Sequence, residues 1–205
     1  MLEGSSRTWQ EKRRESARQE ILAAAWEAAH EHGLGALTLR DIAARVGMRA
    51  PSLYTHFASK NAIYDAMFGQ AWSACEAAFA VAGPPPAEAR AALRWNARTF
   101  FDFAVADLAR HQLMNQRVIP DFTPSPEAYA PAVRVLENTR AIAAAHGITS
   151  DEDFDLWIAL MGGLADAQWA NDPGGTRYAR LLDRAVDMYA DAVGLPATST
   201  TEESR

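Results

Sequence analysis

Apolar residues recur at the spacing of an α-helix along almost the whole chain, and this feature limits the possible folds more than any other. Near the N-terminus, one face of a helix is formed by Ile21, Leu22, Ala25, Trp26 and Ala29. The sequence contains no comparable run of alternating apolar and polar residues, which would indicate a β-strand, and no internal repeat. We therefore predict an all-α fold.

Glycines, prolines and capping residues divide this pattern into separate helices. We expect helices or short helical pieces at about residues 10–32, 39–46, 51–57, 60–81, 87–109, 112–117, 127–146, 151–171 and 175–193. The first three would form a small N-terminal unit, and those after the Pro84-Pro85-Pro86 break would form a larger helical body.

The charges are unevenly distributed along the chain. The formal net charge is -6, but residues 1–60 carry nine Lys/Arg and seven Asp/Glu, whereas residues 61–205 carry eleven and nineteen. A polyanion would thus be attracted to the N-terminal part and repelled by the rest. Cys75 is the only cysteine, so no internal disulfide or Cys-based zinc site is expected. We see neither a signal peptide nor a long apolar span, and we expect a cytoplasmic protein.

Residues 38–57 have the layout of a helix-turn-helix. Thr38 stands three residues before Asp41, which resembles a capping box at the start of a short helix. Gly47 permits a left-handed backbone in the turn, and Leu53 is expected to pack back toward Ile42. Such a unit places its second helix in the major groove of DNA.

The segment VGMRAPSLYTHFASK, residues 46–60, surrounds its apolar positions with hydrogen-bond donors. Hydroxyl groups can bond to phosphate oxygens, and arginine, histidine and lysine can contact phosphates or base edges. The candidate DNA-contacting residues are Thr38, Arg40, Arg49, Ala50, Pro51, Ser52, Tyr54, Thr55, His56 and Lys60. The alternative is a two-helix corner with solvated surface charges, which is common in all-α proteins.

The motif Thr38-Leu39-Arg40-Asp41-Ile42-Ala43, with Val46-Gly47 and the run Leu53 to Lys60, resembles the DNA-binding domain of the TetR (tetracycline-repressor-like) family. The resemblance spans roughly residues 14–68. It implies phosphate contacts by Thr38, Tyr54 and Lys60. The chain departs from the family pattern at Arg49, where Ser or Thr is frequent, at Pro51, where a small residue is more usual, and at Asn61, where Glu is frequent.

The resemblance also implies the organisation of the whole chain. The expected parts are an N-terminal arm and helix-turn-helix over residues 1–59, a linking helix over 60–82, a ligand-binding and dimerisation domain over 83–195, and a disordered tail over 196–205. A homodimer would form through the helices at about 151–171 and 175–193, and its two-fold symmetry suits a palindromic double-stranded operator. Close approach at Gly162 and Gly163 and an apolar face of Leu181, Leu182, Val186 and Tyr189 would support this pairing.

The helical body is rich in bulky side chains with polar groups among them, which is typical of a small-molecule pocket. The candidate ligand-binding residues are Trp72, Trp95, Phe100, Phe103, Met114, Arg117, Trp157, Met161, Asp166 and Gln168. The alternative for each of them is ordinary core packing, and the sequence does not name the effector.

Catalytic and metal sites are not indicated. The acidic cluster of Asp151, Glu152, Asp153 and Asp155 stands at a helix start, where the helix dipole favours acids. His111 lacks a nearby ligand pattern, and no glycine-rich phosphate loop is present. We predict no enzyme, no cofactor and no metal. The sequence indicates a homodimeric, ligand-responsive regulator, most simply a repressor released from its operator by a small apolar or amphipathic molecule. The alternatives are an activator, or a helical ligand-binding or enzymatic protein whose helix-turn-helix is only an interaction corner.

Overall fold

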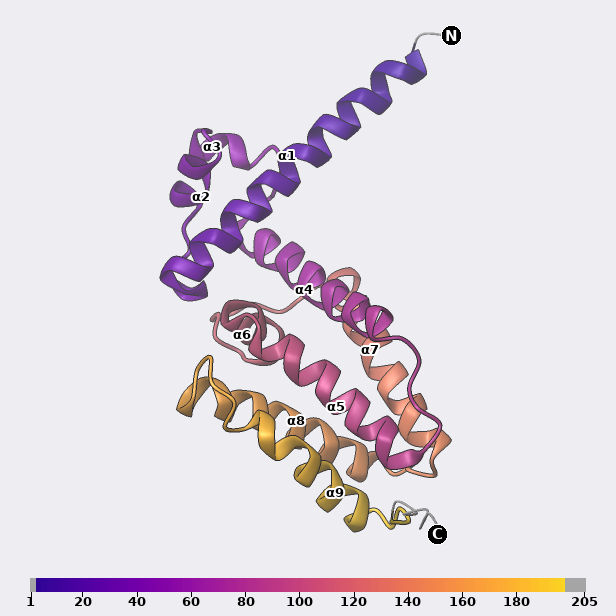
Figure 1. Cartoon of the computed structure of the whole chain (residues 1–205). Helices are drawn as coiled ribbons and strands as arrows, with labels where there is room; N and C mark the ends of the chain where they lie inside the picture. The colour runs from indigo at the N-terminus through magenta and orange to yellow at the C-terminus, as the bar shows by residue number, and fades with distance from the viewer. Residues whose placement is uncertain (1–2, 198–205) are drawn as a thin grey trace. The chain divides into compact units, whose positions relative to one another are not determined.

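The computed structural model describes residues 3–197, and of residues 3–8 only the backbone; within this range the chain is helical and contains no strand (Figure 1). The predicted all-α fold is confirmed. The α-helices are α1 (Glu3–His32), α2 (Leu39–Arg45), α3 (Ala50–Leu53), α4 (Lys60–Ala82), α5 (Ala89–Val105), α6 (Leu108–Asn115), α7 (Pro126–Ala145), α8 (Asp151–Asn171) and α9 (Leu182–Ala192). Two short 3₁₀ helices are η1 (Leu34–Ala36) and η2 (Ala179–Leu181). Between residues 3 and 197, no helix combines the length and apolar character needed to cross a bilayer.

The last helix begins later than the periodicity predicted, at Leu182 instead of about residue 175. Side chains accept hydrogen bonds from backbone N–H groups of the segment that precedes α9. The Asp172 carboxylate accepts the N–H of Arg177 at 2.8 Å, and the Gln168 side-chain oxygen accepts the N–H of Tyr178 at 2.9 Å. These bonds hold the segment in a turn until η2 begins. Most of the predicted disordered tail, residues 198–205, lies outside the described residues.

The contacts group the chain into two compact units. The first unit comprises residues up to 72 together with 109–130, and the second comprises 73–108 together with the chain from 131 onward. Helices α4 and α7 each contribute to both units. The predicted division into arm, linking helix, body and tail stays a prediction.

The core of the first unit lies beneath α1, α2 and the start of α4. Ile21, Ile42, Ile63 and Tyr64 are fully buried there. The Tyr64 hydroxyl donates to the carbonyl of Leu34 at 2.6 Å, which satisfies a polar group that would otherwise be buried without a partner. Burial raises the pKa of Tyr64. This core supports the two short helices α2 and α3, whose Ile42 and Leu53 are buried.

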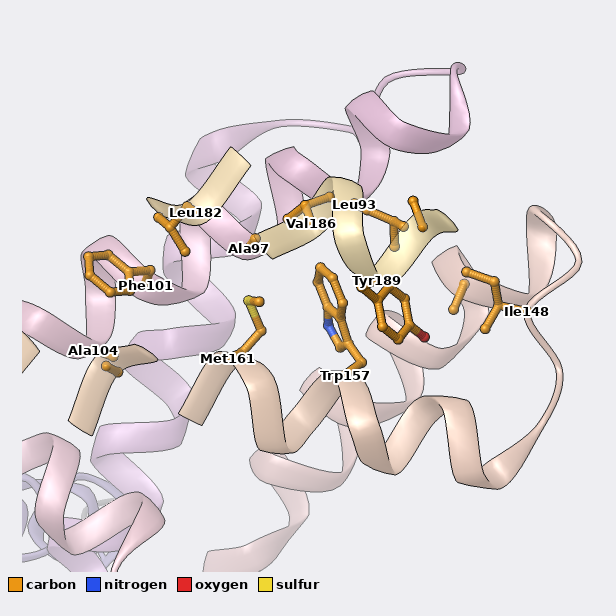
Figure 2. Packing of buried hydrophobic residues seen from close by; sticks show 13 residues of the cluster. Leu93, Ala97, Phe101, Ala104, Ile148, Trp157, Met161, Leu182, Val186 and Tyr189 are labelled. Atoms are coloured by element: carbon orange, nitrogen blue, oxygen red, sulfur yellow. The ribbon is translucent and has the colours of Figure 1, made fainter. Parts of the chain in front are cut away.

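The core of the second unit is formed by α5, α8 and α9, as Figure 2 shows. Trp157 of α8 and Tyr189 of α9 make a tilted aromatic pair with ring centroids 5.0 Å apart. The end of α9 is held by the buried guanidinium of Arg90, which donates to the Asp191 carboxylate at 2.6 Å and to the carbonyl of Leu195 at 2.9 Å. The apolar packing and this charged anchor fix α9 against α5.

Candidate nucleic-acid interface and effector cavity

Helix α2 is fixed at its start by Thr38. The Thr38 hydroxyl oxygen accepts the N–H of Asp41 at 3.1 Å and so satisfies one of the free donors of the first turn. Arg45, near the other end, donates to the carboxylates of Asp41 at 3.3 Å and of Glu31 at 2.6 Å. The bond to Glu31 ties α2 to α1. The Glu31 hydrogen bond raises the pKa of Arg45 and the Arg45 hydrogen bond lowers that of Glu31, so both groups stay charged.

The turn between α2 and α3 has the geometry that the sequence predicted. Gly47 has φ 66° and so adopts the left-handed conformation. The N–H of Met48 reaches back to the carbonyl of Ala43 at 2.8 Å, which closes the end of α2 as a Schellman motif. Pro51 stands in the first turn of α3, where its missing N–H costs little. Leu53 is buried, as is Ile42 of α2.

Helix α3 is shorter than predicted and ends at Leu53 instead of near Phe57. The chain beyond it forms turns, which α1 braces. Arg14 donates to the carbonyl of Thr55 at 3.3 Å, and Arg18 donates to the carbonyl of His56 and lies over the Phe57 ring at 4.1 Å. Sequence reasoning missed this role of Arg14 and Arg18, although the charged run at residues 11–15 was a signal that α1 carries cations.

The candidate DNA-contacting residues differ in their exposure to solvent. Exposed residues are Thr38, Arg40, Arg49, Pro51, Ser52, Tyr54 and Thr55, whereas Ala50, His56 and Lys60 are half-buried. Tyr54 is 58% exposed, and Arg49 precedes α3 without capping it through its side chain. These two residues present donors at opposite ends of α3.

Three candidates are partly engaged within the protein. The Thr55 hydroxyl donates to the carbonyl of Ser52 at 2.7 Å, which leaves it only acceptor capacity toward a ligand. The Lys60 ammonium donates to the carbonyl of Leu37 at 3.1 Å, which leaves two of its three N–H donors. The Nδ1 atom of His56 is buried and has no hydrogen-bond partner among the described residues. The DNA-contacting role of all ten candidates stays a prediction.

A cavity of about 480 Å³ lies in the second unit between the end of α4, α5 and α7. It is largely apolar, and the residues that give it its chemical character are Glu76, Phe79, Trp95, Asn96, Asn138 and Thr139. Of the ten candidate ligand-binding residues, Trp95 lines this cavity. A separate cavity of about 240 Å³ in the first unit includes Met114 and Arg117 in its wall.

The structure does not gather the remaining candidates at these cavities. Trp157 and Met161 belong to the core of the second unit (Figure 2). Phe100 packs against this core. Gln168 is buried and holds the turn before α9. The others are Trp72, which is buried in the first unit, Phe103, which is half-buried, and Asp166, which is exposed. Their assignment to one effector pocket stays a prediction.

The family model described as "Bacterial regulatory proteins, tetR family" matches residues 21–67, from the middle of α1 into α4, and so contains the helix-turn-helix. Residues 21–67 therefore form a DNA-binding domain of the TetR type. No curated protein matches the chain. Beyond the matched residues, the likeness to known proteins is one of fold.

Several solved structures have the fold of this chain over most of its length. A protein of unknown function from Rhodococcus sp. RHA1 is 20% identical, with a TM-score of 0.71 over 85% of this chain and 94% of that one. The TetR family transcriptional regulator PfmR from Thermus thermophilus is 22% identical, with a TM-score of 0.61 over 82% and 96%. A TetR variant from Acinetobacter baumannii AYE, in complex with minocycline, is 19% identical, with a TM-score of 0.57 over 84% and 93%.

Proposed function

We propose that this protein is a homodimeric repressor of the TetR family that binds a palindromic DNA operator through α3 and leaves it when a small apolar or amphipathic molecule binds the helical body. The observation that carries the proposal is the α2–α3 pair. A Schellman turn at Gly47 and a side-chain cap at Thr38 fix it, and Arg49, Ser52 and Tyr54 are exposed along its second helix.

Binding of the operator is supported by the chemistry of this face. The Arg49 guanidinium is suited to phosphate or to the O6 and N7 atoms of guanine, and the hydroxyls of Ser52 and Tyr54 are suited to phosphate oxygens. The rest of the chain carries the excess of acidic residues and would repel DNA, so the duplex would be confined to this face.

A homodimer is supported by apolar side chains on the outer surfaces of α8 and α9. The exposed fractions are 52% for Leu156 of α8 and 63% for Met188 of α9. Ile158 of α8 and Leu181, at the end of η2 just before α9, are also exposed. A Cβ atom added at Gly162 or Gly163 would meet nothing within 4 Å, so a neighbouring helix could approach there. The face named from the sequence was partly wrong, because Leu182, Val186 and Tyr189 point into the core of their own unit.

Ligand response is supported by the cavity of about 480 Å³, a size typical of sites for drug-sized molecules. The minocycline complex of the similar TetR variant is an example of a drug-sized ligand on this fold. The walls belong to α4 and α7 as well as α5, and α4 starts directly after the helix-turn-helix. A ligand that binds a non-DNA-binding conformation better by roughly 1–3 kcal/mol would be enough to shift the population.

The test is selection of DNA fragments from a random pool by the full-length protein. We expect a palindromic sequence whose half-sites lie about one helical turn (~34–36 Å) apart. Placed at the promoter of a reporter gene, this fragment should lower expression when the protein is present, and compounds that release it in vitro should restore expression. Failure to enrich any sequence would contradict the proposal, and increased expression would support an activator in place of a repressor.

A further inference from the structure

The walls of the second-unit cavity limit the class of molecule that it can hold. We propose that the cavity binds an uncharged aromatic compound with one hydrogen-bond acceptor, which Asn96 recognises. The inference deepens the proposed function and rests on it for the consequence that filling the cavity alters DNA binding.

The aromatic part of the ligand is indicated by Phe79 and Trp95. Their rings meet edge to face, with centroids 5.6 Å apart and planes inclined by 62°, and both side chains are only half-buried. The indole N–H of Trp95 is already directed at the carbonyl of Ala82 at 3.4 Å. The two rings therefore offer apolar faces and edges to the cavity, and a flat aromatic ring makes the largest contact with such a surface.

The hydrogen-bonding part is indicated by Asn96, which is 3% exposed and lines the cavity. Its amide nitrogen donates to the Thr139 hydroxyl at 3.3 Å, and its carbonyl oxygen accepts from the indole of Trp157 at 3.3 Å. The Thr139 hydroxyl in turn donates to the carbonyl of Val135 at 3.0 Å, so its hydrogen is used. Within the described residues, these bonds leave one Nδ2–H of Asn96 for an acceptor on the ligand.

The charges at the cavity indicate that the ligand is neutral. Among the described residues that line the cavity, Glu76 is the one that carries a charge. Both of its carboxylate oxygens are bonded by Arg134 at 2.7 Å. This hydrogen bond lowers the pKa of Glu76, so the pair stays ionised and internally neutral. An anionic ligand would lie beside a carboxylate without a free cation, and a cationic ligand would have to compete with Arg134.

The test is calorimetric titration of the full-length protein, without DNA, with four naphthalenes of similar size. Acetylnaphthalene carries a carbonyl acceptor, ethylnaphthalene lacks it, naphthoate is an anion and naphthylmethylammonium is a cation. We expect acetylnaphthalene to bind about fivefold tighter than ethylnaphthalene, as one hydrogen bond to a buried group predicts. Both charged compounds should bind more weakly than either neutral one.

Two variants on α4 locate the binding. Ala80 lines the cavity, whereas Ala77, one turn away, does not, and both are exposed positions that can accept a larger side chain. Ala80→Trp should abolish the binding of acetylnaphthalene, and the matched Ala77→Trp should leave it unchanged. Helical content and the unfolding temperature of each variant establish that it is folded.

The proposal is overturned if none of the four compounds binds, if naphthoate or the ammonium compound binds as tightly as acetylnaphthalene, or if the two tryptophan variants behave alike. Because no DNA is present, such a failure concerns the ligand class alone. The proposed regulatory function is judged by the selection of an operator, and its failure would leave the calorimetric result standing.

Discussion

Gly47 is the residue on which the relative orientation of α2 and α3 depends, because its backbone has φ 66°. A residue with a Cβ atom is strained there by about 1–2 kcal/mol. We expect Gly47→Ala to lower the free energy of unfolding, measured by urea denaturation, by about 1 kcal/mol. The control is Gly35→Ala in η1, where the backbone does not have positive φ and an added Cβ would meet nothing within 4 Å. Equal effects of the two substitutions would contradict this role of Gly47.

The Glu76–Arg134 pair gives the stability of the protein a dependence on pH. Arg134 lowers the pKa of Glu76 in the folded state, so the pair stabilises the fold above the unfolded-state pKa of Glu76, which is about 4.3. This stabilisation is lost as the pH falls through the lower folded-state pKa. We expect thermal unfolding of Glu76→Gln to show a shallower loss of stability on acidification than the parent protein does. An unchanged acid limb would show that the pair contributes nothing.

Residue roles could be predicted from the sequence where they depend on neighbouring positions. The cap at Thr38 and the left-handed Gly47 follow from local chemistry, and the structure confirms both. The bracing roles of Arg14 and Arg18 depend on how α1 lies against the turns after α3, about forty residues away in sequence. Local patterns contain no information about such a contact.

At the scale of elements, the start of α7 is tied to α4 within the first unit. The Asp65 carboxylate accepts the N–H of Ser125 at 2.6 Å and its hydroxyl at 2.7 Å, and the Ser125 oxygen caps the N–H of Ala128 at 3.1 Å. Nearby, the two helices approach so closely that a Cβ added at Gly69 would lie 3.5 Å from the Ala128 backbone. This joint connects α4, which follows the helix-turn-helix, to α7, which lines the cavity of about 480 Å³.

Removing the joint should loosen the start of α7. We expect Asp65→Asn to cost about 1–3 kcal/mol in unfolding free energy, since hydrogen bonds to a charged group are lost. Amide hydrogen exchange at residues 125–129 should become faster. The matched control is Glu127→Gln in the first turn of α7, which removes an exposed carboxylate without a role in the joint. Unchanged exchange in Asp65→Asn would mean that packing alone holds the two helices together.

Helix boundaries were predictable where a glycine ends an element, as at Gly33 and Gly147. The predicted boundaries were wrong where side chains far along the chain or in the preceding helix form hydrogen bonds with the backbone. Helix α3 therefore ends before the turns that Arg14 and Arg18 brace, and α9 starts only after the turn held by Gln168. The residues that line the cavity were the least predictable feature, because aromatic residues at helical spacing look alike whether they fill a core or line a cavity.

At the scale of the whole molecule, two copies are expected to associate through α8 and α9. Met188→Glu would place a charge at an exposed apolar position of α9, so we expect it to shift the protein toward the monomer in sedimentation velocity experiments. The control is Val81→Glu, since Val81 is 88% exposed and lies on α4. A parent protein that sediments as a monomer, or a dimer that Met188→Glu leaves intact, would contradict the proposed interface.

We expect the exposed face of α3 to contact the DNA backbone, and the proposed function depends on this contact. It is tested most directly by the salt dependence of operator binding, measured by fluorescence anisotropy for the parent protein, Arg49→Ala and Arg177→Ala. Arg177 is an exposed arginine of the second unit whose guanidinium lies 5.3 Å from the Tyr178 ring, so its removal changes the net charge equally. We predict an affinity that falls steeply with salt and a log–log slope reduced by about 1 in Arg49→Ala only. A salt-independent affinity, or equal slopes for both variants, would contradict the claim.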